Sequence, residues 1–461
     1  MTELTKQKDL NVYNDVYNAR VFYDLFKEKV KWCKDYGGWY IYNGKYWQRD
    51  NNDYIKLCAV EAYERIALLM TEINSGKAKT HKTKSGSSSS LSSMIECAKA
   101  FLACESRDFD NNEFLINCTN GTYDLINYTF NEFKPSDLIT KTTYVNYNPN
   151  AKCPNWDRFI DEIFLGNEEL KRFFMRAIGY AMTGSNKEQA MFILYGHGRN
   201  GKGSVVQTIA NILGDYGMGC PSSTLLVKNG NVIPNDIARL KGSRFVMASE
   251  TNQNVTLDEA LIKQITGGDR ISARFLNKEW FDFTPTFKIF FATNHKPNIR
   301  GTDQGIWRRI KMIPFELNVS EEREDRLLGQ KLRSESEGIF NRMIEGFQDW
   351  AAQGLNTPET VKSATQLYRE EEDDLGQFIY QECIKEKDCT IATTEFKEKF
   401  KAVMGYYKSA KIINEYMARN GHKPTEDNRY KINGKQVRAY VNIRFRTEMD
   451  NIKSEEIQWQ E

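Results

Sequence analysis

The stretch that decides the fold runs Met191-Phe-Ile-Leu-Tyr195, then Gly196-His-Gly-Arg-Asn-Gly201-Lys202-Gly-Ser204, then Val205-Val-Gln-Thr-Ile-Ala-Asn-Ile-Leu213. It predicts a short apolar strand, a glycine-rich loop and a helix with one apolar face. Glycines let the backbone curl so that successive N–H groups point at phosphate oxygens, and the helix adds its positive N-terminal end. Lys202 can then reach the β- and γ-phosphates of a nucleotide. The sequence therefore predicts a phosphate-binding loop.

The candidate nucleotide-binding residues all belong to this loop: Gly196, Gly198, Asn200, Gly201, Lys202, Gly203 and Ser204. The residue after the lysine is normally a Ser or Thr that binds Mg²⁺, and here it is Gly203. We expect Ser204 to supply that hydroxyl, or water to fill the position. A glycine-rich turn that matches by chance is the alternative. The strand before the loop and the helix after it favour nucleotide binding.

Composition excludes some classes of protein. Hydrophobic residues make up 40% and charged residues 27% of the 461, which is typical of globular domains. The net charge is only +2, so any contact with nucleic acid must come from local clusters of basic residues. We expect a cytoplasmic protein without a membrane segment, because no apolar run nears the roughly eighteen residues needed and no signal peptide is visible. Nine cysteines without a CxxC and four scattered histidines argue against zinc.

Before the loop, a helical pattern from Val16, a strand pair hinged at Asn43-Gly44 and another about Asn120-Gly121 predict a mixed α+β domain. Residues 75–92 are polar and contain a serine run, which predicts a mobile loop rather than a nucleic-acid contact. The whole chain is therefore predicted as an α/β protein in five parts. These are an N-terminal domain over 1–150, a helical collar over 151–187 with its helical pattern at 156–181, a central α/β domain with the phosphate-binding loop over 188–318, helices over 319–372, and a winged-helix-like unit with a tail over 373–461.

An acidic residue follows the next apolar strand of the core. Arg244-Phe-Val-Met-Ala248 predicts a strand, and Ser249-Glu250 comes directly after it. P-loop ATPases place a carboxylate here to hold Mg²⁺ through water or to orient the water that attacks the γ-phosphate. Only one acid is present, so both roles fall on Glu250. Ser204 and Glu250 are thus the candidate metal-binding residues.

A third strand, Lys288-Ile-Phe-Phe-Ala-Thr-Asn294, ends in an asparagine whose amide can contact both the attacking water and the γ-phosphate. Arg308 and Arg309 follow. Paired arginines in this place suit an arginine finger, which reaches the phosphate of a neighbouring subunit. An ordinary pair of surface salt bridges is the alternative. The order of the motifs favours the finger and leaves open which arginine provides it.

Two segments are candidates for DNA binding. Alternating residues on either side of Asn277-Lys278 predict a hairpin, and its Arg274 and Lys278, close to Trp280, suit a nucleic-acid backbone passing the tip. An exposed hairpin without a ligand is the competing interpretation. The terminal unit, predicted as three helices and a strand pair about Asn433-Gly434, offers basic residues on or near its third helix: Lys408, Lys411, Arg419, His422 and Lys423. A packing or protein-contact role is the alternative there.

Taken in order, these motifs resemble superfamily 3 helicases, and more closely the phage/plasmid and poxvirus-type primase-helicase group. The core segments are Gly196 to Ser204, Ser249-Glu250, Thr266-Gly-Gly-Asp269, Ala292-Thr-Asn294 and Trp307-Arg-Arg-Ile310. Outside the core, Asn120 to Leu125 and Cys153 to Trp156 look like the family's N-terminal helicase-associated domain, and Gly338 to Trp350 and Ala364 to Arg369 look like its C-terminal helices. The resemblance covers roughly residues 35–390.

The resemblance implies an AAA+-like ATPase core, a homohexameric ring and ATP-driven 3′-to-5′ movement on DNA with a pore hairpin. It also implies roles for single residues: Lys202 binds phosphate, Glu250 activates water, Asn294 senses the nucleotide, Arg308 or Arg309 is the finger, and Lys263 and Lys278 face the DNA. The primer-synthesis domain of many relatives is not seen upstream, so no primase activity is expected.

The expected function is an ATP- and Mg²⁺-dependent replicative helicase of a phage or other mobile element in a bacterial cytoplasm. Its expected partners are single- and double-stranded DNA, further copies of itself and other replication proteins. The second hypothesis is an origin-binding initiator that uses ATP for assembly and local melting. The third is a P-loop ATPase without a role on DNA.

Overall fold

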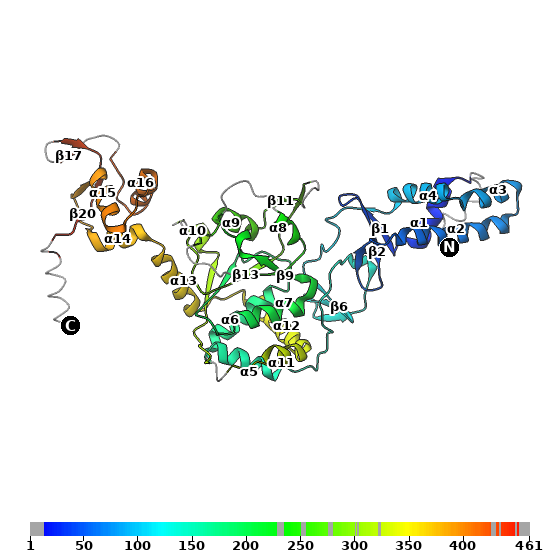
Figure 1. The fold of residues 1–461 in the computed structure, drawn as a ribbon, viewed down its shortest axis with the longest axis horizontal. Helices are drawn as coiled ribbons and strands as arrows, with labels where there is room; N and C mark the ends of the chain where they lie inside the picture. Colours follow the sequence, from blue (N-terminus) through cyan, green and yellow to red (C-terminus); the bar gives the residue numbers. More distant parts are fainter. Residues whose placement is uncertain are drawn as a thin grey trace. The chain divides into compact units, whose positions relative to one another are not determined.

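The computed structural model describes residues 13–227, 235–249, 255–274, 280–299, 301, 304–320, 324–425, 430–432, 435–447 and 450. The chain divides into two compact units (Figure 1). The first unit comprises Met1–Pro297 and Arg308–Lys362, and the second comprises Asn298–Trp307 and Ser363–Glu461. No helix in the described part of the chain is both long and apolar enough to cross a membrane. The finer division into five parts stays a prediction.

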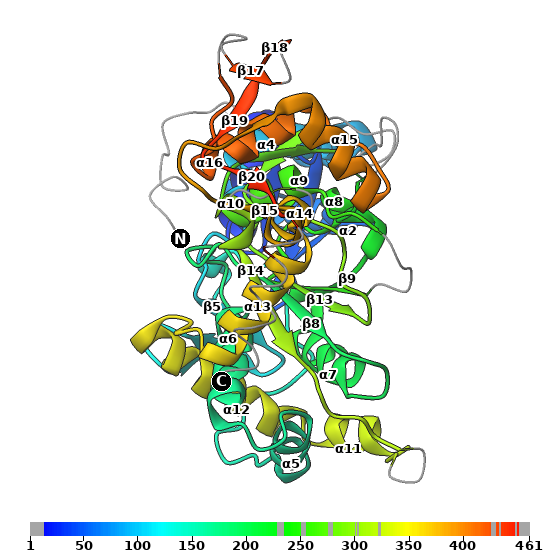
Figure 2. The same ribbon diagram turned by 90° about the vertical axis from the view of Figure 1, so that its left-hand side faces the viewer.

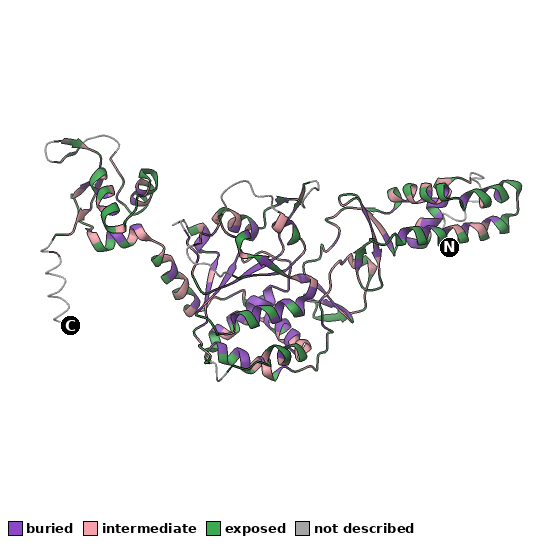
Figure 3. Cartoon of the chain, in the orientation of Figure 1, coloured by how far each residue is buried: buried purple, intermediate pink, exposed green. Residues whose placement is uncertain are grey.

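A five-stranded parallel sheet forms the centre of the first unit. Its strands are β8 (Met191–Tyr195), β9 (Gly217–Pro221), β10 (Phe245–Ser249), β13 (Lys288–Thr293) and β14 (Ile310–Pro314). They lie in the order β14-β8-β13-β10-β9, and every neighbouring pair is parallel. All six residues of β13 are buried, as in parallel sheets covered on both faces (Figure 3). Because the strands are parallel, the C-terminal ends of β8, β10 and β13 lie at one edge of the sheet.

The core helices and the predicted hairpin attach to this sheet. The core elements outside the sheet are α7 (Lys202–Leu213), η3 (Gly214–Tyr216), η4 (Ser222–Thr224), α8 (Asn235–Arg239), α9 (Glu259–Gly267), β11 (Ile271–Ala273) and β12 (Phe281–Phe283). Val205, Ile209 and Ile212 of α7 are buried, so this helix packs its apolar face inward. Strands β11 and β12 pair antiparallel, which confirms the predicted hairpin; Asn277 and Lys278 at its tip lie outside the described residues.

The segment with the helical pattern at 156–181 forms two helices, α5 (Pro154–Ile163) and α6 (Glu168–Tyr180). Leu165 and Gly166 both adopt positive φ, 51° and 73°, which a continuing right-handed helix cannot accommodate. Asn167 then starts α6 afresh by accepting the N–H of Leu170.

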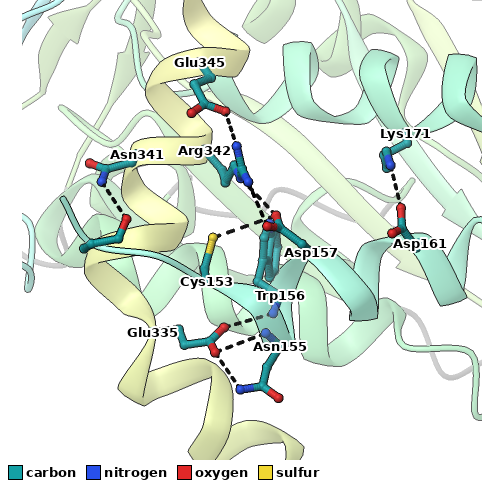
Figure 4. Close-up of polar contacts among 11 residues, drawn as sticks. Cys153, Asn155, Trp156, Asp157, Asp161, Lys171, Glu335, Asn341, Arg342 and Glu345 are labelled. Carbon is teal, nitrogen blue, oxygen red and sulfur yellow. Dashed lines mark hydrogen bonds and ion pairs between the residues drawn. The ribbon is translucent and has the colours of Figure 1, made fainter. Parts of the chain in front are cut away.

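Two later helices, α11 (Leu328–Ser334) and α12 (Ser336–Gln353), complete this helical layer. At the N-terminus of α5, the N-cap residue Cys153 makes no capping hydrogen bond with its side chain. The Glu335 side chain caps this helix end instead (Figure 4). Its carboxylate accepts the N–H groups of Asn155 at 3.1 Å and Trp156 at 3.0 Å. A carboxylate also suits the positive N-terminal end of a helix. Arg342 of α12 forms two bonds, of 2.9 and 2.8 Å, to Asp157 of α5. The helices that precede β8 and the helices that follow β14 therefore pack together as one layer.

The N-terminal part combines a helical group with two small sheets. Its elements are α1 (Asp15–Phe26), β1 (Val30–Cys33), β2 (Gly38–Tyr42), β3 (Trp47–Arg49), α2 (Tyr54–Ile73), α3 (Gly76–Ser85), α4 (Ser88–Phe101), β4 (Ala103–Cys104), β5 (Leu115–Cys118), β6 (Gly121–Asp124), β7 (Thr129–Asn131) and η2 (Pro135–Asp137). The antiparallel pairs β2–β3 and β5–β6 confirm the two predicted hairpins.

The mobile loop expected over residues 75–92 is wrong, because this tract forms α3 and the start of α4. The serines that suggested a linker act as N-caps: Ser75 accepts from Ala78 N–H, and Ser87 accepts from Ser90 N–H. His81 is buried, and its Nε2 lies 2.7 Å from Asn18 Oδ1. Tertiary contacts with α1 thus order a segment of low intrinsic hydrophobicity.

The second unit contains α10 (Gln304–Trp307), most of α13 (Glu359–Glu371), α14 (Asp374–Glu382), β15 (Cys383–Ile384), β16 (Thr390–Ala392), α15 (Thr393–Met404), α16 (Ala410–Arg419), β17 (Tyr430–Ile432), β18 (Lys435–Val437), β19 (Ala439–Val441) and β20 (Arg444–Phe445). Its core is aromatic, and Phe378, Phe396, Phe400 and Tyr440 are buried together. The three helices and the β17–β18 pair occur in the predicted order (Figure 2). Asn433 and Gly434 lie outside the described residues.

Candidate functional site

The loop between β8 and α7 holds glycines of two kinds. Gly201 adopts a φ of +82°, and a Cβ there would lie 2.8 Å from Ile163 Cγ2 of α5. A Cβ on Gly196 would lie 2.1 Å from the carbonyl oxygen of Phe315. Gly198 and Gly203 have no atom within 4 Å of the position a Cβ would take. The first two glycines are therefore required by packing, and the other two leave open space next to the loop backbone.

The Lys202 side chain lies inside the loop and forms hydrogen bonds to two of its residues. Its Nζ donates to the carbonyl oxygen of Gly196 at 2.6 Å and to Asn200 Oδ1 at 2.9 Å. Asn200 in turn donates from Nδ2 to the carbonyl oxygens of His197 at 2.5 Å and Phe315 at 3.1 Å. The lysine is only 6% exposed, and burial lowers its pKa to about 8. A phosphate beside this ammonium would offset its desolvation, so the loop is well suited to an anion.

Of the two expected magnesium residues, only Ser204 lies among the described residues. Gly203 and Ser204 are exposed in the first turn of α7, so the Ser204 hydroxyl is accessible to a metal ion. Glu250, the expected water-activating residue, follows β10 directly and lies outside the described residues. Among the described residues, no three His, Cys, Asp or Glu side chains gather to hold a metal ion.

Asn294 is exposed and directly follows β13. In the sheet, Thr293 pairs with Tyr195, the last residue of β8 before the loop. The end of β13 therefore lies beside the start of the loop, and the contact of Asn294 with a nucleotide stays a prediction.

Arg308 and Arg309 have opposite environments. Arg309 is 8% exposed, and its Nε donates to Thr266 Oγ1 of α9 at 3.0 Å. Arg308 is exposed, and its Nη2 donates to Gln189 Oε1 at 2.7 Å. A surface hydrogen bond to an amide is easily exchanged for a stronger partner, whereas a buried guanidinium is not. Only Arg308 of the pair can reach another molecule without unpacking the core.

On the hairpin, the guanidinium carbon of Arg274 lies 4.9 Å from the centre of the Trp280 ring, which is 54% exposed. Ser272 Oγ donates to Asp282 Oδ1 at 2.6 Å and links the two strands near this pair. Lys278 lies outside the described residues, and Lys263 lies on α9 rather than on the hairpin. The described part of the hairpin thus presents one aromatic ring and one cation side by side.

In the second unit, Lys411 and Arg419 are exposed at the two ends of α16. Lys408 is in an ion pair with Asp374, which reduces its availability for DNA. The prediction that His422 is a basic residue on the surface of this unit is wrong. Its side chain is 4% exposed, and its Nδ1 donates to the carbonyl oxygen of Val441 at 3.0 Å.

Sequence reasoning missed the residues that support the loop from other elements. Phe315, just after β14, accepts from Asn200, and Ile163 and Phe159 of α5 pack against Gly201. Nothing local in the sequence signals these contacts, because they join segments about forty and over one hundred residues away in the chain. Thr266, the partner of Arg309, lies in a segment that the sequence had singled out without a role.

Two family models match the chain. Residues 19–165 match the model described as D5 N terminal like, and residues 194–309 match a family of unknown function, DUF5906.

Several viral proteins are similar in sequence. A protein named as a candidate helicase, L207/L206 of Acanthamoeba polyphaga mimivirus, is 28% identical over 59% of this chain and 31% of its own length. Another candidate helicase, 184R of Invertebrate iridescent virus 6, is 32% identical over 59% of this chain and 32% of its own. A candidate primase, C962R of African swine fever virus (isolate Warthog/Namibia/Wart80/1980), is 25% identical over 60% and 31%. The match thus spans about a third of the length of these relatives.

A solved structure, the A form apo structure of the NrS-1 C terminal region, has a similar fold. It aligns with a TM-score of 0.52 and 12% identity, and covers 94% of this chain and 100% of the other. At this identity the likeness concerns the fold alone.

Proposed function

Because this chain belongs to the D5-like primase-helicase family, we propose that it is an ATP-dependent DNA helicase that acts in the replication of a virus, phage or other mobile element. The observation that carries this proposal is the loop after β8, where a buried lysine and an ordered asparagine face a glycine backbone at the start of a helix. This arrangement is typical of P-loop nucleotide sites.

The proposed reaction is hydrolysis of ATP by water. Lys202 and the N–H groups at the start of α7 bind the phosphates, and Gly198 and Gly203 leave space for them. Mg²⁺, held by Ser204 and water, neutralises phosphate charge when bound. Glu250 orients the attacking water, and Asn294, next to the loop through the β8–β13 pair, contacts the γ-phosphate.

In the proposed homohexameric ring, Arg308 is the residue that enters the neighbouring subunit's site. Arg308→Ala is expected to lower the DNA-stimulated ATPase rate by roughly 10²-fold or more, since an arginine finger contributes about 10³–10⁵ in the best-studied cases. The measurement is phosphate release at a protein concentration that supports assembly.

The matched variant Arg309→Ala separates the two roles. It is expected to lower thermal stability, because it leaves Thr266 without its buried donor. In a mixing experiment, Lys202→Ala subunits retain the finger, and Arg308→Ala subunits retain the loop. Partial recovery of activity on mixing supports a finger in trans, and none for any mixture contradicts it.

The hairpin of β11 and β12 is proposed to contact the DNA strand. Trp280 offers a face on which a base can stack, and Arg274 adds a positive charge. Trp280→Ala is expected to weaken binding of single-stranded DNA about tenfold, given about 1–3 kcal/mol for each stacked base. Fluorescence anisotropy of a labelled oligothymidylate measures this binding.

The control for loss of an exposed aromatic ring is Tyr144→Ala. Tyr144 is 65% exposed and lies in the same unit, outside the hairpin. Equal losses for Trp280→Ala and Tyr144→Ala would argue against a specific role of the hairpin.

The second candidate function is an origin-binding initiator. It is favoured by the terminal unit, whose three helices and strand pair are those expected of a winged helix and whose third helix exposes Lys411 and Arg419. Footprinting tests it. Protection of one sequence in preference to random duplex supports the initiator, and uniform binding supports the helicase alone.

A further inference from the structure

A cavity of about 360 Å³ lies within the second unit. It is formed where the end of α14, the end of α16 and the residue after β20 approach one another. Its lining residues are Gly376, Ile379, Tyr380, Cys383, Ile384, Lys385, Tyr416, Asn420, His422 and Arg446. None of them belongs to the nucleotide loop or to the β11–β12 hairpin, so the cavity is separate from both of those sites.

Two buried nitrogen atoms on this cavity lack hydrogen-bond partners. Within the described residues, five buried side-chain polar atoms have no partner, and two of the five, His422 Nε2 and Arg446 Nε, belong to residues that line this single cavity. An unsatisfied buried polar group lowers the stability of the folded chain, so such groups are usually retained for a reason. Their coincidence in one cavity points to a missing ligand.

Both side chains are held in place by their other nitrogen atoms. The His422 side chain is only 4% exposed, and its Nδ1 donates to the carbonyl oxygen of Val441 at 3.0 Å. Nε2 is therefore the free position, which accepts in the neutral ring and donates in the imidazolium. Arg446 donates from Nη2 to the carbonyl oxygen of Tyr380 at 3.2 Å. This leaves its Nε–H for a ligand.

The charges around the cavity favour an anion. Lys385 and Arg446 are cationic, and no Asp or Glu is among the lining residues. Two other cavities of similar size in the described chain do carry carboxylates, Glu372 and Asp373 in one and Asp157, Glu345 and Asp349 in the other. The Tyr416 hydroxyl is already bound to Asp373 Oδ2 at 2.6 Å and does not compete for the ligand.

We propose that this cavity binds a phosphate group, with His422 and Arg446 as direct ligands and the exposed Lys385 at its opening. An oxygen of the phosphate accepts from the Arg446 Nε–H, and His422 Nε2 is the second unpartnered atom available to the same group. The phosphate can come from a DNA backbone or from a free phosphate or nucleotide, and the experiment below separates these sources.

The test uses the small number of histidines. The full chain contains four, so ring-selective ¹³C labelling gives four histidine signals, and His422→Gln identifies one of them. Titration with inorganic phosphate at constant ionic strength is expected to shift the His422 signal and to saturate. A second titration uses oligothymidylate in phosphate-free buffer. The His197 signal reports phosphate at the nucleotide loop independently.

Matched variants assign the ligands. Arg446→Gln and Lys385→Gln are expected to weaken phosphate binding at the His422 signal at least about fivefold, in keeping with loss of a charge-assisted hydrogen bond. Lys387→Gln removes a nearby exposed lysine outside the cavity and is expected to leave it unchanged. Lys385 is exposed, so its variant keeps the proposal testable even if Arg446→Gln impairs folding.

The outcomes are distinct. Shifts with both probes support the phosphate site with DNA as its source, and shifts with phosphate alone support a free phosphate or nucleotide. A His422 signal that responds to neither probe in the folded wild-type chain overturns the proposal. Equal phosphate affinity of Arg446→Gln, Lys385→Gln and Lys387→Gln also overturns it.

Discussion

Lys202→Ala is expected to lower the turnover number for ATP hydrolysis by about 10²–10³-fold, the usual cost of removing one donor that stabilises transition-state charge. The lysine is the one charged side chain of the loop that lies buried against it, and its two present acceptors, Gly196 O and Asn200 Oδ1, hold it at the site. The measurement is steady-state phosphate release with saturating ATP and single-stranded DNA.

A matched control distinguishes this loss from a general loss of charge. Lys187→Ala removes an exposed lysine whose Nζ lies 4.2 Å from the centre of the Trp350 ring, and hydrolysis is expected to continue. Lys202→Ala should also remain folded, because burial of the ammonium already opposes its charged form. Wild-type turnover in a folded Lys202→Ala protein would contradict the assignment.

Gly179→Ala is expected to destabilise the first unit by about 3 kcal/mol, at the upper end of overpacking effects. Gly179 of α6 faces Gly346 of α12 where the two helices cross. A Cβ on Gly179 would lie 2.1 Å from the backbone nitrogen of Phe347, and one on Gly346 would lie 2.2 Å from the carbonyl oxygen of Met175. Because the nearest atoms are backbone, relief requires the helices to separate.

Chemical denaturation monitored by circular dichroism measures this effect. The control is Gly329→Ala in α11, where the nearest atom to a Cβ is Arg333 Nη1 at 4.0 Å. There the substitution is expected to be neutral or to stabilise by about 0.5 kcal/mol through helix propensity. Similar effects of Gly179→Ala and Gly329→Ala would show that the helices are not packed backbone to backbone.

The sequence predicted those elements whose signal is local. Buried parallel strands such as 191–195 and 288–293 are continuous apolar runs, and the β2–β3 and β5–β6 hairpins turn at Asn-Gly. The loop was recognisable because glycines and a lysine at fixed spacing lie between a strand and a helix.

Elements that depend on tertiary contacts were not predicted. Strand β9, Gly217–Pro221, has two glycines and a proline and takes its conformation from its pairing with β10. The serine-rich 75–92 tract is helical because capping and the buried His81 order it. Arg308 and Arg309 differ in burial. Because they are adjacent and of the same residue type, the sequence alone cannot show which of them is buried. The unpartnered atoms of His422 and Arg446 likewise emerge only when separate elements meet.

The most direct test of the proposed helicase is strand displacement on a forked DNA duplex, with ATP and Mg²⁺, by the wild-type protein and by Lys202→Ala. The account predicts that the wild type separates the strands, that its hydrolysis is stimulated by single-stranded DNA, and that the variant does neither. Hydrolysis that ignores DNA, with no strand separation, would contradict a motor on DNA and leave an ATPase that acts on another partner.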